Sequence, residues 1–146
     1  MGARRIGRER ALQALFQLDQ AEPRALPTDA LAAAWASTDE DPKDPDAQDP
    51  EAQAFARELV DGVREHLAEI DALIESHSHH WRLDRMQRVD RNVLRLGVYE
   101  LTRRADIPRK VTINEAIELG KKYGNEESAA FINGLLDRVA IAVNKP

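Results

Sequence analysis

Apolar residues recur at spacings of three and four along most of the chain, which is the period of an amphipathic helix. No stretch shows the two-residue alternation of a half-buried strand. The pattern predicts helices over residues 6–18, 28–36, 52–75, 82–104, 112–123 and 126–143. We therefore expect an all-α protein of about seven helices, in which short turns join antiparallel neighbours.

Particular residues mark several expected helix ends. The residue before Pro108 is disfavoured in the helical region, so the preceding helix should stop there. Thr112 with Glu115 three residues later matches a capping box, which predicts a helix that begins at Thr112. Gly124 is expected to end that helix in the left-handed conformation, and Asn125 to cap the last helix.

The charge of the chain is unevenly distributed. The net charge is -5, but a single block from Asp39 to Glu51 holds seven acids, one lysine and three prolines. We interpret residues 37–50 as a solvated acidic loop, because proline removes helix hydrogen bonds and clustered acids favour water. The remainder of the chain is close to neutral, so the overall acidity says little about the surface of the folded part.

Composition limits the class of protein. The 146 residues are 42% hydrophobic and 32% charged, as in an ordinary soluble domain. No apolar run approaches the roughly 18 residues of a membrane span, and the N-terminus lacks an apolar signal core. The absence of cysteine excludes disulfides and thiolate zinc sites. We therefore expect one cytoplasmic domain over residues 1–146, with no membrane association.

The candidate catalytic and metal-binding residues have structural interpretations. His77, His79 and His80 lack the helical spacing and the further ligand of a zinc site, so we interpret them as solvated residues between helices. Glu126 and Glu127 could pair for acid–base chemistry, but acids are also favoured in a first helical turn. The sequence therefore predicts no enzyme, no metal and no cofactor.

Arginine placement points instead toward nucleic acid, because the guanidinium fork can hold two phosphate oxygens at once. Sixteen of the 21 basic residues are arginine. Arg4, Arg5 and Arg8 lie at a helix start, where the helix dipole disfavours positive charge. Three more share one face of the helix predicted over 82–104: Arg88, Arg91 and Arg95. The alternative is a solvated face on which these arginines pair with Asp84 and Asp90.

Three segments resemble one known family. "RVDRNVLRLGVYELTRRADIPRKVTINEAIELGKKYG" and the later "FINGLLDRV" are similar to the NusB family of bacterial transcription antitermination factors. "RERALQALFQLD" resembles the first helix of that family, whereas residues 20–80 match only in helical pattern. The resemblance implies a compact bundle of two helical subdomains. It also implies binding to boxA RNA as a heterodimer with the ribosomal protein NusE. That complex joins elongating RNA polymerase with other Nus factors and promotes read-through, notably in ribosomal RNA operons.

The resemblance also implies individual site residues. Those expected to bind RNA are Arg4, Arg5, Arg8, Arg91, Arg95, Glu127, Phe131 and Asn133. Those expected to dock NusE are Phe16 and Asp90, and we expect Asp90 to be exposed. Glu127 replaces a family aspartate, so its contact is expected to differ. Phe131 has two interpretations, as a helix core residue or as a platform for an unpaired base.

The sequence is also compatible with two other functions. Some RNA methyltransferases carry a NusB-like domain ahead of a catalytic domain. This chain ends at Pro146 with no strand followed by a glycine-rich loop and helix, so we expect no site for a methyl donor. A protein-only adaptor with solvated arginines is the other alternative, and salt-dependent RNA binding would separate it from an RNA-binding factor.

Overall fold

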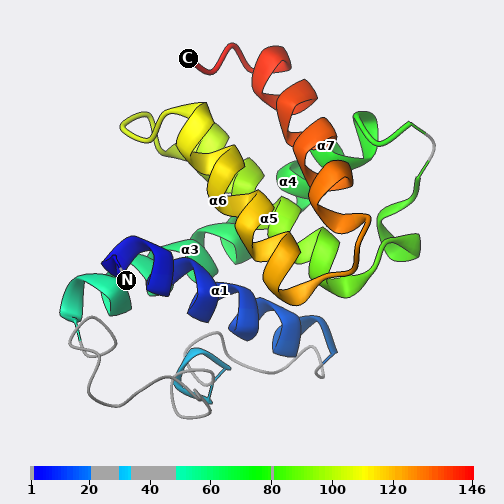
Figure 1. The fold of residues 1–146 in the computed structure, drawn as a ribbon. Helices are drawn as coiled ribbons and strands as arrows, with labels where there is room; N and C mark the ends of the chain where they lie inside the picture. Colours follow the sequence, from blue (N-terminus) through cyan, green and yellow to red (C-terminus); the bar gives the residue numbers. More distant parts are fainter. Residues whose placement is uncertain (1, 21–29, 34–48, 80) are drawn as a thin grey trace. The chain divides into compact units, whose positions relative to one another are not determined.

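The computed structural model describes residues 2–20, 30–33, 49–79 and 81–146 (Figure 1). Its elements are α1 (Ala3–Gln20), α3 (Pro50–Glu65), α4 (Leu67–Ser76), the 3-10 turn η2 (Leu83–Arg85), α5 (Arg88–Arg103), α6 (Arg109–Tyr123) and α7 (Ser128–Ala142). Residues 30–33 are also helical, and the described residues contain no strand. The all-α fold is confirmed. Most of the acidic loop and the rest of the helix predicted over 28–36 lie outside the described residues.

The chain divides into two compact units, residues 1–65 and 66–146. In the first unit α1 packs against α3, and the apolar stripe of each helix is buried. In the second unit α5 packs against α4, α6 and α7. No helix among the described residues is long and apolar enough to cross a membrane. The two helical subdomains expected from the family resemblance correspond to these units.

The single helix predicted over 52–75 is wrong, because the structure has two helices there. The chain leaves helical geometry at His66 (φ -109°, ψ 23°), between α3 and α4. The apolar stripe continues across this break, yet its two halves enter different cores. Leu59 and Val63 are buried in the first unit, whereas Ile70 and Ile74 are buried in the second. Hydrophobic periodicity indicates that a side chain faces a core, but it does not indicate which of two cores that is.

The predicted capping box at Thr112 is also wrong. Helix α6 begins at Arg109, directly after Pro108, so Thr112 already lies within the helix. The Thr112 hydroxyl is buried and donates a hydrogen bond to Oε1 of Glu100 on α5, at 3.0 Å. Thr112 thus joins two helices of the second unit, a role that local sequence cannot distinguish from capping.

The turn between α6 and α7 differs from the prediction in two respects. Gly124 has φ -96°, so it does not adopt the left-handed conformation. A Cβ there would collide with the Ser128 side chain, so this position requires a small residue for lack of space. Oδ1 of Asn125 accepts a hydrogen bond from the Glu127 amide at 2.9 Å, and α7 begins later, at Ser128. Asn125 therefore orders the turn and does not cap a helix that starts at Glu126.

Candidate functional site

A pocket of about 330 Å³ lies in the second unit. Its lining residues are Trp81, Arg85, Met86, Gln87, Asp90, Asn125, Glu127 and Phe131. They come from η2 and its flanks, the first turn of α5, the α6–α7 turn and the start of α7. The pocket brings together three residues that the family resemblance singled out, Asp90, Glu127 and Phe131, although 41 positions separate the first from the last.

Two aromatic side chains contribute to this pocket. Trp81 is 57% exposed, and Phe131, in the first turn of α7, is half-buried. Phe131 is therefore neither a fully buried core residue nor a free surface residue, and part of its ring is open to the pocket. Trp81 was missed in the sequence because it lies between helices, where hydrophobic periodicity marks nothing. Its only sequence signal is a large aromatic residue in a polar segment.

Asp90, in the first turn of α5, lines the pocket. The expectation that Asp90 is exposed is wrong, since it retains only 8% of its accessible surface. Among the described residues its Oδ1 atom has no hydrogen-bond partner. Burial raises the pKa of the Asp90 carboxyl above its ordinary value, and a hydrogen bond from Ser128 partly opposes this shift. A buried acceptor without a partner is costly unless a ligand or water supplies the missing donor.

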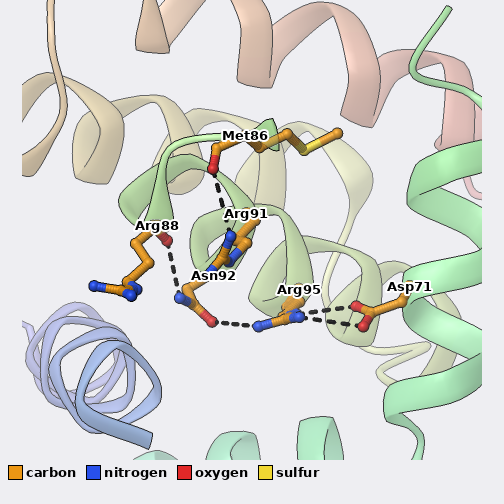
Figure 2. Close-up of polar contacts among 6 residues, drawn as sticks. All are labelled: Asp71, Met86, Arg88, Arg91, Asn92 and Arg95. Carbon is orange, nitrogen blue, oxygen red and sulfur yellow. Dashed lines mark hydrogen bonds and ion pairs between the residues drawn. The ribbon is translucent and has the colours of Figure 1, made fainter. Parts of the chain in front are cut away.

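The arginine stripe on α5 is not a uniform solvated face (Figure 2). The Arg95 guanidinium donates to Asp71 of α4, with Nε 2.9 Å from Oδ1 and Nη2 3.2 Å from Oδ2. Its Nη1 also donates to Oδ1 of Asn92, at 3.0 Å. Arg91 is half-buried, and its Nη1 lies 3.5 Å from the carbonyl oxygen of Met86, whereas Arg88 is exposed. Only part of the stripe is therefore open to a ligand.

Two further residues predicted to bind RNA, Asn133 and Glu127, are both exposed in the second unit. Asn133 is exposed on α7, but it is not among the residues that line the pocket. Glu127 is exposed at the pocket edge, directly before α7. A carboxylate at that position adds negative charge to the rim, so the pocket is not uniformly suited to phosphate.

The N-terminal arginines lie on α1, in the first unit. Arg4 and Arg5 are exposed, whereas Arg8 keeps only 4% of its accessible surface. Phe16, further along α1, is half-buried. The three arginines that look equivalent in the sequence therefore differ in exposure, since Arg4 and Arg5 reach the surface and Arg8 does not.

The histidine-rich segment after α4 has local hydrogen bonds. Nδ1 of His77 lies 2.9 Å from the carbonyl oxygen of Leu73 and 2.9 Å from the hydroxyl of Ser76. His79 is exposed with φ 50°, and His80 lies outside the described residues. Over the part of the chain that is described, no group of three or more histidine, aspartate or glutamate residues is placed to hold a metal ion.

Sequence comparisons identify relatives over the full length of the chain. The NusB family matches residues 5–141. The transcription antitermination protein NusB of Myxococcus xanthus is 66% identical over 146 residues, which cover 100% of both chains. The protein of the same name from Sorangium cellulosum is 50% identical over 143 residues, covering 96% of this chain and 93% of that one.

Solved structures agree with these relatives. NusB from T. maritima superposes with a TM-score of 0.81 at 40% identity, covering 94% of this chain and 90% of that chain. A NusB in a crystal structure of antitermination factors NusB and NusE with double-stranded RNA superposes with a TM-score of 0.81 at 28% identity. That match covers 96% of this chain and 97% of the other.

Proposed function

Because the chain belongs to the NusB family, we propose that it is a transcription antitermination factor that binds boxA-type single-stranded RNA together with NusE. It acts in the cytoplasm, within the elongating RNA polymerase complex and with other Nus factors, and promotes read-through of ribosomal RNA operons. It performs no catalysis and requires no cofactor.

The pocket of the second unit is the observation that carries the RNA-binding proposal. Single-stranded RNA is recognised mainly through unstacked bases, which stack on aromatic rings and donate or accept hydrogen bonds at their edges. Phe131 and Trp81 supply two rings at this pocket, and Asp90 lines it with a carboxyl group whose buried Oδ1 has no partner among the described residues. A volume of about 330 Å³ accommodates one base. We infer that an unpaired base enters here, with Asn133 and Glu127 near its flanking nucleotides.

Phosphate contacts come from the accessible arginines. We assign Arg91 and the exposed Arg4 and Arg5 to the RNA backbone. A contact from Arg95 would share its guanidinium with Asp71, and a contact from Arg8 would need more than the 4% of its surface that is now open. We therefore expect these two arginines to contribute less to binding than the other three.

NusE docking is assigned to Phe16 and Asp90. Phe16 is half-buried on α1 and offers part of an aromatic surface. Asp90 lines the pocket and is 8% exposed, so we expect its partner to be either a donor of NusE or a donor of the RNA that enters there. Asp90→Asn separates these partners. Weaker RNA binding without NusE assigns the acceptor to RNA, and an effect seen only with NusE assigns it to the protein.

Fluorescence anisotropy with a boxA-type RNA and a scrambled RNA of equal length tests the proposal. We expect the chain to bind boxA-type RNA more tightly than the scrambled RNA, and NusE to increase that difference. The affinity should fall steeply with added salt, because arginine–phosphate contacts release counterions. Equal, salt-independent binding of the two RNAs with and without NusE would support the protein-only adaptor instead.

A further inference from the structure

Arg85 lines the pocket of the second unit, and the family resemblance assigns no role to it. Of the described residues that line the pocket, Arg85 is the only one with a positively charged side chain, whereas Asp90 and Glu127 carry carboxyl groups. Arg85 is exposed, and its guanidinium has no hydrogen bond or ion pair with the part of the chain that is described. Its five donors are therefore available to a ligand at the pocket.

The backbone of η2 is anchored on both sides of Arg85. Leu83 and Met86 are buried, and the Arg85 amide donates a hydrogen bond to the carbonyl oxygen of Arg82 at 3.0 Å. The Met86 amide donates to the carbonyl oxygen of Leu83 at 3.1 Å. Packing and hydrogen bonds thus fix the main chain at Arg85, while its side chain is exposed. A residue on an ordered segment loses less conformational entropy when it binds a ligand.

The segment before η2 orders the backbone of Trp81 in the same way. The Ser78 hydroxyl is buried and lies within hydrogen-bonding distance of the carbonyl oxygens of Glu75 and Trp81. The Trp81 amide donates to the carbonyl oxygen of Ser78 at 3.2 Å. One ordered segment therefore brings an aromatic ring, Trp81, and a cation, Arg85, to the same pocket.

The charges around the pocket indicate what Arg85 would bind. A base is neutral, but it carries an anionic phosphate that is joined to it through one sugar. A base that enters the pocket brings this phosphate close to the rim, where the exposed carboxylate of Glu127 would repel it. Arg85 can offset this repulsion, because a guanidinium fork can hold two phosphate oxygens at once.

We propose that Arg85 binds the phosphate directly beside the base that enters the pocket, so that Phe131 contacts the base and Arg85 contacts the phosphate of one nucleotide. This inference rests on the proposed RNA binding and deepens it, because it predicts which two parts of the RNA meet at the pocket. An acidic side chain of NusE is the alternative ligand for the same guanidinium. NusE affinity measured without RNA separates the two ligands.

Arg85→Ala tests the phosphate contact. With NusE at saturating concentration, this variant should bind boxA-type RNA about three- to tenfold more weakly, and its salt slope should be shallower by about 0.7, the contribution of one single-strand phosphate. Arg85→Lys should keep the slope and lose part of the affinity, because it keeps the charge without the fork. Arg82→Ala is the matched control, since Arg82 is exposed in the same segment and pairs with Asp84, but does not line the pocket. It should leave both quantities nearly unchanged.

A scan of the RNA locates the contact. Methylphosphonate linkages, each of which removes one phosphate charge, are placed one at a time along boxA-type RNA, and single bases are removed in a second set. One linkage should weaken binding to the unaltered chain but have no further effect on Arg85→Ala, because that contact is already lost. One base removal should likewise have no further effect on Phe131→Ala. We expect this base and this linkage to belong to the same nucleotide.

Three results would overturn the assignment of Arg85 to this phosphate. They are a loss of RNA affinity in Arg85→Ala no larger than in Arg82→Ala, a linkage that is not adjacent to the base sensed by Phe131, and weaker binding of NusE to Arg85→Ala in the absence of RNA. In each case the unaltered chain still binds boxA-type RNA, so the proposed function stands. If the unaltered chain with NusE binds no boxA-type RNA, the proposed function itself fails.

Discussion

Arg95 and Asp71 form a two-point ion pair between α5 and α4, with Nε 2.9 Å from Oδ1 and Nη2 3.2 Å from Oδ2 (Figure 2). The family resemblance predicts that Arg95 binds RNA. In the structure Arg95 pairs with Asp71, which lies 24 positions earlier in the chain. The two side chains retain 12% and 23% of their accessible surface. The pair is therefore shielded enough to contribute to the stability of the second unit.

Asp71→Asn should lower the free energy of unfolding by about 1–3 kcal/mol, since the pair lies between exposed and fully buried examples. Urea denaturation measures the change. Glu69→Gln is the matched control, because Glu69 pairs with Arg103 across the same helices but both side chains are largely exposed. It should cost less than about 1 kcal/mol. Equal losses in the two variants would contradict a special role for the Arg95–Asp71 pair.

Asp90→Asn should make the fold more stable at neutral pH. Burial raises the pKa of Asp90, so the folded chain keeps this proton after the unfolded chain has lost it. The stability that this group contributes is present below its unfolded pKa, about 3.9, and is lost as the pH rises through the folded-state pKa. The asparagine variant does not titrate. Its advantage, about 1–3 kcal/mol at neutral pH, should shrink toward acid pH.

Unfolding in urea at about pH 4 and about pH 7 checks this dependence. Asp84→Asn is the control, because Asp84 is exposed and pairs only across the surface with Arg82. Its stability difference should stay small at both values. An Asp90→Asn variant that is less stable than the unaltered protein at neutral pH would show that a partner stabilises the ionised carboxylate.

Phe131→Ala should weaken RNA binding by about 1–3 kcal/mol, the usual contribution of one stacked base. The slope of affinity against salt should change little, because stacking releases no counterions. Ile132→Ala is the neighbouring control. Ile132 is fully buried, so its loss should cost the fold about 2–5 kcal/mol. A similar loss of stability in Phe131→Ala, with unchanged RNA affinity, would assign Phe131 to the core.

Replacing both Arg4 and Arg5 with alanine should flatten the salt dependence of RNA binding by about 1.4, since each single-strand phosphate contact contributes roughly 0.7 to the slope. Binding should weaken for boxA-type and scrambled RNA alike, because phosphate contacts carry no sequence information. Arg8→Ala should change the slope less, since Arg8 is buried. An unchanged slope in the double variant would remove the start of α1 from the RNA surface.

Helices and their approximate extents could be predicted because core-facing residues repeat with the helical period. Their ends were less predictable, since the same residues serve several purposes. Thr112 fits a capping box, but its hydroxyl donates a hydrogen bond to Glu100 of α5. This acceptor could not be predicted from the sequence, because it depends on the packing of α5 against α6. Gly124 fits a left-handed cap, but it is small because the Ser128 side chain crowds it.

Of the residues that line the pocket, only those within the family motifs could be predicted from the sequence. The family segments single out Asp90, Glu127 and Phe131, and the structure adds Trp81 as a fourth residue at the same pocket. Trp81 carries no periodic signal, and Asp90 is buried on α5 with a hydrogen bond from Ser128 of α7. Burial is a property of neighbours in space, so a pattern along one helix could not have supplied it.

By itself, the sequence determined the all-α class, the arginine-rich start of α1 and the motifs that identify the family, because these depend on residue type and local spacing. Tertiary structure alone decided which arginine is exposed, which is buried and which is paired with Asp71. It also decided that residues from η2, α5 and α7 meet around one pocket. Identical side chains acquire different roles because burial and partner distance follow from the packing of helices, and local spacing does not encode that packing.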